Sequence, residues 1–453
     1  MINHIIRPKI GLVTVASKVE SGGQRGEEII HNALRQLEQA GLELVTPGFT
    51  VWGAMDAERA VLFLKDSGID LLLILHCTWM MDSIQFQLVK GLDIPVMLWG
   101  LPYPETFSLA SVQHFSSVLH QNKHFSQWVY GLPDETCVKE KIARMARASQ
   151  AAKKFRPVNI GLVGQHSTKR IAGPQDTVFD EWDLAQTLGI KVVHIEMDDF
   201  VSEINAVIDE DAQAVVKLMK ETGRYGEVKV EEKRILHSAK VYAATKKIMA
   251  DYNLAGVAVE CYPYYGGLVN LASSWLADEG IVLDPEGDVG HTMLASLLNA
   301  LQPGPTALAE MMLLDWDKDS FYLRHEGSTA FSLALDPQKA EVIAAGEGVG
   351  TIVQFPMRPI PTATVASLRG RSGSYSLFTG KLSIVKIDPH QWQKWGGNFQ
   401  IAAKTTEGLD VLLNNVFTNG MDHHWLIKEG DIVQLLETVA DIWGLSKVSL
   451  NQR

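Results

Sequence analysis

The sequence predicts an α/β fold with two doubly wound, Rossmann-like parallel-sheet domains, followed by a β-rich, barrel-like C-terminal domain. Two observations predict it. Short apolar runs alternate with helical stretches up to about residue 301, and β-rich runs with glycine turns replace them afterwards. In addition, a chain of 453 residues exceeds the length at which one hydrophobic core usually keeps growing. We therefore expect domains at residues 1–155, 156–301 and 302–453.

The first domain begins with the apolar run KIGLVTVAS (9–17), which predicts a buried strand. Amphipathic helical patterns follow in GEEIIHNALRQLEQAG (26–41) and MDAERAVLFLKDSG (55–68), and they alternate with the strand-like runs IDLLLILHC (69–77) and IPVMLWG (94–100). Strands that alternate with helices favour a parallel sheet covered on both faces. This order predicts a doubly wound domain.

The same pattern restarts at Arg156, after a basic helical stretch. The strands PVNIGLVGQHS (157–167) and LAGVAVECY (254–262) enclose a long helical segment at 230–252. Beyond Gln302 the alternation ends, and the β-rich runs predict a barrel or sandwich in which helix returns only at GDIVQLLETVADIWG (430–444).

Composition excludes several classes of partner. The chain has 41 basic and 53 acidic side chains, and its net charge of −12 repels nucleic-acid and membrane phosphates. Its three cysteines are far apart and have no CxxC spacing, so we expect them to be reduced. The first residues lack the features of a signal peptide, and no run of eighteen apolar residues occurs. We expect a cytoplasmic protein without a membrane or nucleic-acid partner.

Polar and aromatic residues follow several predicted parallel strands. Ligands of open parallel sheets bind beyond the carboxyl ends of the strands, although packing is the commoner role of any one such residue. The residues at these positions are His76, Cys77, Trp79, Trp99, Gln165, His166, Glu260 and Tyr262.

An acidic segment precedes a strongly apolar helical run. Asp284, Glu286 and Asp288 lie within five residues, where three carboxylates repel one another unless a cation, water or a helix N-terminus compensates. One interpretation is a solvated N-cap region, and the other is a set of ligands for a hard metal ion.

Three further candidates lie downstream. Glu310 is flanked by apolar residues in TALAEMMLLDWD, where a carboxylate is costly unless it is paired, protonated or bound to metal. His325 interrupts another run suited to burial, and His423 and His424 are adjacent in GMDHHW. Adjacent side chains on an extended strand point to opposite faces, so one histidine could bind metal while its neighbour meets substrate.

Together these segments resemble the L-fucose isomerase and L-arabinose isomerase superfamily. The resemblance rests on PEGDVGHTM, on Glu310 24 positions after Glu286, on LRHEGS and on DHHW, and the domain order is similar along nearly the whole chain. It implies a metal-dependent aldose–ketose isomerase in which Glu286 and Glu310 are metal ligands and the proton-transfer pair. His424 is implied as a metal ligand, and His325 is similar to a further histidine ligand of the arabinose branch.

The resemblance further implies Mn²⁺, or else Co²⁺ or Mg²⁺, and a homo-oligomer such as a hexamer with a site shared between subunits. Glu310 stands where the L-fucose branch has Asp, so the sugar is left open among L-fucose, D-arabinose, L-arabinose and a sulfonated hexose such as sulfoquinovose. Both a cis-enediol proton transfer and a hydride shift would use the same residues. The candidate substrate-binding residues are Arg25, Gln24, His325, His423 and Trp425.

Two other functions remain open from the sequence. A non-catalytic sugar-binding or regulatory protein could share the twin α/β architecture, although it would not need clustered carboxylates and histidines. A nucleotide-dependent enzyme is suggested by GEGVG (346–350), but this segment opens no predicted helix and lacks the GxGxxG spacing.

Overall fold

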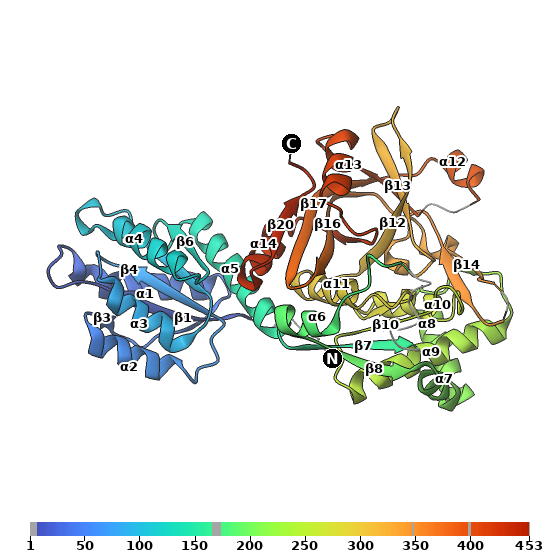
Figure 1. Cartoon of the computed structure of the whole chain (residues 1–453), viewed down its shortest axis with the longest axis horizontal. Coiled ribbons are helices and arrows are strands. Elements are labelled where there is room, and N and C mark those ends of the chain that lie inside the picture. Colours follow the sequence, from blue (N-terminus) through green and yellow to red (C-terminus); the bar gives the residue numbers. More distant parts are fainter. Residues whose placement is uncertain (1–6, 165–173, 347, 397–399, 453) are drawn as a thin grey trace. The chain divides into compact units, whose positions relative to one another are not determined.

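The computed structural model describes residues 7–164, 174–346, 348–396 and 400–452 (Figure 1). The described residues up to Lys154, with Asp441–Gly444, form one compact unit, which we name the N-terminal unit. Phe155–Ala440 and the residues from Leu445 onward form another, the C-terminal unit. The three-domain division remains a prediction. Within the described ranges, no helix is both long and apolar enough to cross a membrane.

The N-terminal unit is built on the parallel sheet that the sequence predicts. The strand order is β2-β1-β4-β5-β6, with β3 also paired to β1. Helices α1 and α5 contribute to one hydrophobic cluster with the sheet, while α2, α3 and α4 contribute to another. The elements are β1 (Lys9–Val15), α1 (Gly26–Gln39), β2 (Glu43–Val45), β3 (Thr50–Val51), α2 (Ala54–Leu64), β4 (Leu71–His76), α3 (Asp82–Leu92), β5 (Val96–Gly100), α4 (Ser108–Gln121), β6 (Ser126–Tyr130) and α5 (Thr136–Lys154).

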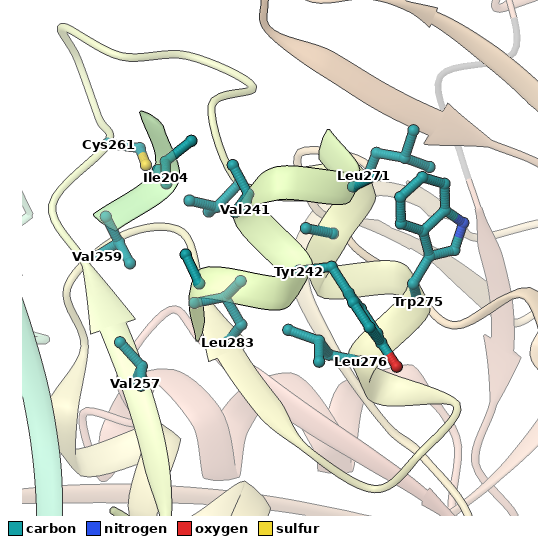
Figure 2. Packing of buried hydrophobic residues seen from close by; sticks show 14 of the residues in the cluster. Ile204, Val241, Tyr242, Val257, Val259, Cys261, Leu271, Trp275, Leu276 and Leu283 are labelled. Carbon is teal, nitrogen blue, oxygen red and sulfur yellow. The ribbon is translucent and has the colours of Figure 1, made fainter. Parts of the chain in front are cut away.

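The C-terminal unit begins with a second parallel sheet, of order β11-β10-β7-β8. Figure 2 shows part of its core, where Val257 and Val259 of β10 lie among side chains of α9 and α10 such as Tyr242 and Trp275. The elements are β7 (Val158–Gly164), α6 (Glu181–Leu188), β8 (Ile190–Glu196), α7 (Met197–Ala206), α8 (Asp209–Glu221), α9 (Glu232–Asp251), β10 (Gly256–Val259), α10 (Asn270–Ala277), β11 (Val282–Asp284) and α11 (Val289–Leu301). A small sheet, β15-β14-β9, joins β9 (Glu227–Val228), β14 (Glu341–Ala344) and β15 (Thr351–Gln354).

The β-rich region closes into an antiparallel barrel of six strands, which confirms the barrel-like prediction. Its order is β16-β19-β12-β13-β18-β17, and β17 pairs back with β16. A seventh strand, β20 (Ser446–Ser449), adds to β17 in parallel. The barrel strands are β12 (Thr306–Asp315), β13 (Ser320–Arg324), β16 (Ile360–Arg371), β17 (Ser374–Val385), β18 (Ile401–Lys404) and β19 (Trp425–Glu429).

The expectation that helix returns only near the C-terminus is wrong. Before α14 (Val433–Trp443), the chain forms α12 (Pro389–Lys394) and α13 (Leu409–Thr418). Leu409, Leu412 and Val416 of α13 recur at spacings of three and four residues and pack into the barrel core. This periodicity is helical, but it extends over only ten residues between strands.

Lys428 of β19 is fully buried in the barrel. Burial lowers its pKa to about 7, and its ammonium donates to Asn299 Oδ1 at 2.9 Å and to the Gly304 carbonyl. In the unfolded chain the lysine pKa is about 10.4. Between these values the unfolded state holds a proton that the folded state has released, so stability rises with pH by about 1.4 kcal/mol per unit.

We therefore expect the melting temperature of the wild type to rise more between pH 7 and pH 9 than that of Lys428→Met, measured by calorimetry. Lys386→Met, at an exposed position, serves as the control and should follow the wild type. Equal slopes for the wild type and Lys428→Met would show that this lysine does not titrate in the predicted window.

Candidate active site

Three neighbouring barrel strands carry three of the predicted site residues to one end of the barrel. Glu310 lies on the central strand, β12, directly opposite Arg324 of β13, so the next residue, His325, leaves β13 beside it. On the other side of β12, Ala309 pairs with Trp425 of β19, and His424 immediately precedes that strand. The strand register therefore explains why residues up to 114 positions apart, from Glu310 to His424, meet at one place.

Glu286 comes from the parallel sheet, on the turn between β11 and α11. Buried Asp284 closes this turn, because its Oδ1 accepts the backbone N–H groups of Glu286 and Asp288, each at 2.9 Å. Asp288 caps the N-terminus of α11 through a 2.9 Å hydrogen bond from the backbone N–H of His291. Asp288 is thus an N-cap residue as one interpretation expected, but it is buried and not solvated, while Glu286 points away to meet the barrel residues.

Four side chains converge: Glu286, Glu310, His325 and His424. The Nε2 atom of His424 lies 3.2 Å from Glu286 Oε2 and 4.0 Å from Glu310 Oε1. The Nε2 atom of His325 lies 3.7 Å from Glu286 Oε1 and 4.0 Å from Glu310 Oε1. Both histidines are buried, whereas Glu310 is partly exposed and gives the cluster access to solvent.

Asp288 contacts the Nδ1 side of the His424 ring, away from the cluster. Its Oδ2 atom lies 2.8 Å from Nδ1 of His424 and 2.7 Å from Nδ1 of His291, and all three side chains are buried. On the far side, Nε2 of His291 accepts the backbone N–H of Leu368 at 3.3 Å, which places the proton of a neutral His291 ring on Nδ1. Because Asp288 accepts the Nδ1 proton of His424, Nε2 is the atom that His424 presents to the cluster.

The electrostatics of the two glutamates differ. Burial by itself raises the pKa of Glu286, but the hydrogen bond from His424 outweighs it and lowers the pKa below its ordinary value. Burial and the neighbouring charge of Glu286 raise the pKa of Glu310. Burial lowers the pKa of His325 to about 4, so this ring is neutral at physiological pH. For His424, burial opposes protonation, but hydrogen bonds to Asp288 and Glu286 raise its pKa well above the usual range.

This donor set fits a divalent cation. Nε2 of His325 is buried and, among the described residues, has no hydrogen-bond partner, although it faces two carboxylates. Ligands about 2.1 Å from one cation lie about 3 Å apart when adjacent and about 4 Å apart when opposite. The four histidine–carboxylate separations in this cluster are 3.2 to 4.0 Å. Mixed carboxylate and imidazole donors suit Mn²⁺ and similar ions better than thiolate-seeking metals.

The other candidate residues have different surroundings. His423 lies at the rim, with Nε2 3.8 Å from Glu310 Oε1 and Nδ1 2.6 Å from Asp176 Oδ2. Trp425 is buried in the barrel core, where its ring centroid lies 5.7 Å from that of Phe321.

Arg25 and Gln24 belong to the N-terminal unit. Arg25 pairs with Glu105, and its guanidinium carbon lies 4.9 Å from the centre of the Tyr103 ring. Gln24 is exposed.

Of the residues at strand ends, Glu260 is close to this site, because it forms an isolated backbone bridge with Glu286. His76 is instead buried, with Nε2 2.6 Å from Gln85 Oε1, which is a packing role. Gln165 and His166 lie outside the described residues. Segment 346–350, the weak nucleotide signal, connects the antiparallel strands β14 and β15, and its Glu347 also lies outside the described residues.

Sequence reasoning missed the supporting roles of Asp288, His291 and Asp176. The first two carry a detectable signal, because an aspartate before an apolar helix with a histidine three positions later is typical of an N-cap whose carboxylate can also meet an imidazole. Asp176 carries no such signal, since its partner His423 lies 247 positions away in the sequence.

Comparison with known proteins gives distant relatives over most of the chain. The chain is 22% identical over 384 residues to a sulfoquinovose isomerase of Alkalicoccus urumqiensis, and the aligned region covers 80% of this chain and 82% of the relative. It is 21% identical over 395 residues to a sulfoquinovose isomerase of Priestia aryabhattai, covering 82% and 84%. No protein-family model matches the chain. The similarity is consistent with a sugar isomerase.

Proposed function

We propose that this chain is an aldose–ketose isomerase that requires a divalent cation, Mn²⁺ or another such as Co²⁺ or Mg²⁺. The observation that carries the proposal is the convergence of Glu286, Glu310, His325 and His424 from four separate segments, with ligand atoms that all lie within 4.8 Å of one another. Such a set of carboxylates and imidazoles is costly to bury unless it has a ligand to hold.

In this proposal the four side chains hold the cation. When bound, it polarises the sugar carbonyl and makes the neighbouring hydroxyl more acidic. One of Glu286 and Glu310 then removes the proton from C2 of the open-chain sugar, and the other moves protons at C1 or at the oxygens through a cis-enediol. The buried imidazoles of His325 and His424 keep water away from the inner side of the site.

The first substrate to test is sulfoquinovose, because two relatives carry that name over four fifths of the chain. L-Fucose, D-arabinose and L-arabinose are the alternatives. We further propose a cytoplasmic homo-oligomer, with a hexamer as the first assembly to test by light scattering. His325, His423, Trp425, Arg25 and Gln24 remain proposed substrate-binding residues.

The decisive experiment is to strip the protein with a chelator, resupply Mn²⁺ and follow ketose formation from this panel of aldoses. We expect turnover only with metal, and Mn²⁺ should also raise the melting temperature of the stripped protein, because a ligand of the folded state stabilises it. Deuterium from solvent at C1 or C2 of the product would support the enediol route over a hydride shift. Tight sugar binding with Mn²⁺ but without turnover would instead indicate a non-catalytic sugar-binding protein.

A further inference from the structure

Asp176 and His423 form a hydrogen-bonded pair at the rim of the metal cluster. One oxygen, Oδ2 of Asp176, accepts the backbone N–H of His423 at 2.9 Å and lies 2.6 Å from Nδ1 of the same residue. Burial by itself raises the pKa of Asp176, but these hydrogen bonds outweigh it and lower the pKa far below the ordinary value. A carboxylate only accepts hydrogen bonds, so the proton of a neutral His423 ring lies on Nδ1 and leaves a lone pair on Nε2.

The segment that carries Asp176 is fixed on both sides of this residue. Arg371 of β16 donates to the Gln175 carbonyl at 2.7 Å. Phe179 is buried and stacks on Tyr375, with ring centroids 6.4 Å apart. The Phe179 ring also packs over Gly290, where a Cβ would lie only 2.3 Å from the ring, so glycine is required for this contact. Asp176 is thereby held in place before any ligand arrives.

The free face of His423 is directed at the site. Its Nε2 lies 3.8 Å from Oε1 of Glu310, and its ring centroid lies 4.3 Å from that of His424. About a third of the His423 side chain is exposed, so a small molecule can reach it. A sugar hydroxyl that donates its proton to Nε2 at about 2.8 Å would lie beside the Glu310 oxygen.

We propose that Asp176 is a positioning residue of the active site, which fixes His423 in the tautomer whose Nε2 accepts a hydrogen bond from a substrate hydroxyl beside Glu310. The inference rests on the proposed isomerase function for the identity of the ligand as a sugar. The geometry of the pair itself does not depend on that function. In the interactions described above Asp176 contacts none of the four proposed metal ligands, and it acts on their neighbour His423 instead.

The test compares Asp176→Ala with Asp180→Ala, a control on the same segment. Asp180 caps α6 by accepting the backbone N–H of Asp183 and makes no described contact with His423. The tautomer of His423 is read by ¹⁵N NMR of histidine-labelled protein, and its signal is assigned by its loss in His423→Gln. We expect Nδ1–H in the wild type and in Asp180→Ala, and a shift towards Nε2–H in Asp176→Ala.

Kinetics then connect the tautomer to catalysis. We expect Asp176→Ala to lower kcat/KM by about 10- to 100-fold, mainly through KM, while the Mn²⁺ affinity measured by EPR titration is unchanged. On a His423→Gln background the same substitution should cost clearly less than in the wild type, because only the backbone hydrogen bond to Asp176 is then left to lose. A wild-type tautomer in Asp176→Ala, or losses that add fully in the double variant, would overturn the proposal. Because the NMR measurement needs no substrate, it tests whether Asp176 fixes the tautomer of His423 even if no aldose is turned over.

Discussion

Glu286→Gln is expected to lower kcat/KM for ketose formation by about a thousandfold or more, since it removes both a metal ligand and one member of the proton-transfer pair. The substitution preserves the size of the side chain but removes the charge that faces His325 and His424. Titration with Mn²⁺, followed by EPR, should show weaker binding in the same variant. The metal-free variant should remain folded, because the volume of the side chain is unchanged.

Glu341→Gln is a matched control for this prediction. Glu341 lies in the same unit but pairs with Lys229 at the protein surface, where an ion pair contributes little. It should leave both turnover and Mn²⁺ binding unchanged. If Glu286→Gln retained metal-dependent turnover within tenfold of the wild type, the cluster would not be the reaction centre.

The sequence predicts the parallel sheets well because each buried strand is a nearly continuous apolar run that helices cover on both sides. Strand β4 (Leu71–His76), for example, is buried at every position. For the barrel, the sequence predicts a β-rich domain but not how its strands pair. Closure depends on the pairing of β16 with β17 and of β18 with β13, which no local pattern specifies. Helix α13 was missed because its ten residues lie among strands with little helical context.

Predictions for the site depended on resemblance more than on spacing. Glu286 is detectable because it lies among carboxylates before an apolar helix, and Glu310 because it interrupts an apolar strand. What no local signal could give is the register that places Ala309 opposite Trp425, and hence His424 beside Glu310. The Asp176–His423 pair was beyond reach for the same reason, since tertiary contacts between distant segments are not encoded in periodicity.

Trp425→Ala is expected to lower the free energy of unfolding of the C-terminal unit by about 3–5 kcal/mol, the usual cost of truncating a large buried aromatic side chain. Trp425 is 1% exposed and packs with Phe321 inside the barrel core. Urea unfolding followed by circular dichroism measures the loss. Trp316→Ala is the matched control, because Trp316 is 59% exposed and its truncation should change stability little.

Trp425→Phe separates this packing role from the substrate-binding role proposed for the same residue. Phenylalanine keeps an apolar ring in the core. If Trp425 only packs, Trp425→Phe should therefore lose only part of the stability that Trp425→Ala loses, and its KM for the sugar should equal that of the wild type. If the indole of Trp425 contacts the sugar, Trp425→Phe should instead have a raised KM and nearly unchanged stability. The first outcome is favoured because the ring of Trp425 packs against Phe321 inside the barrel core.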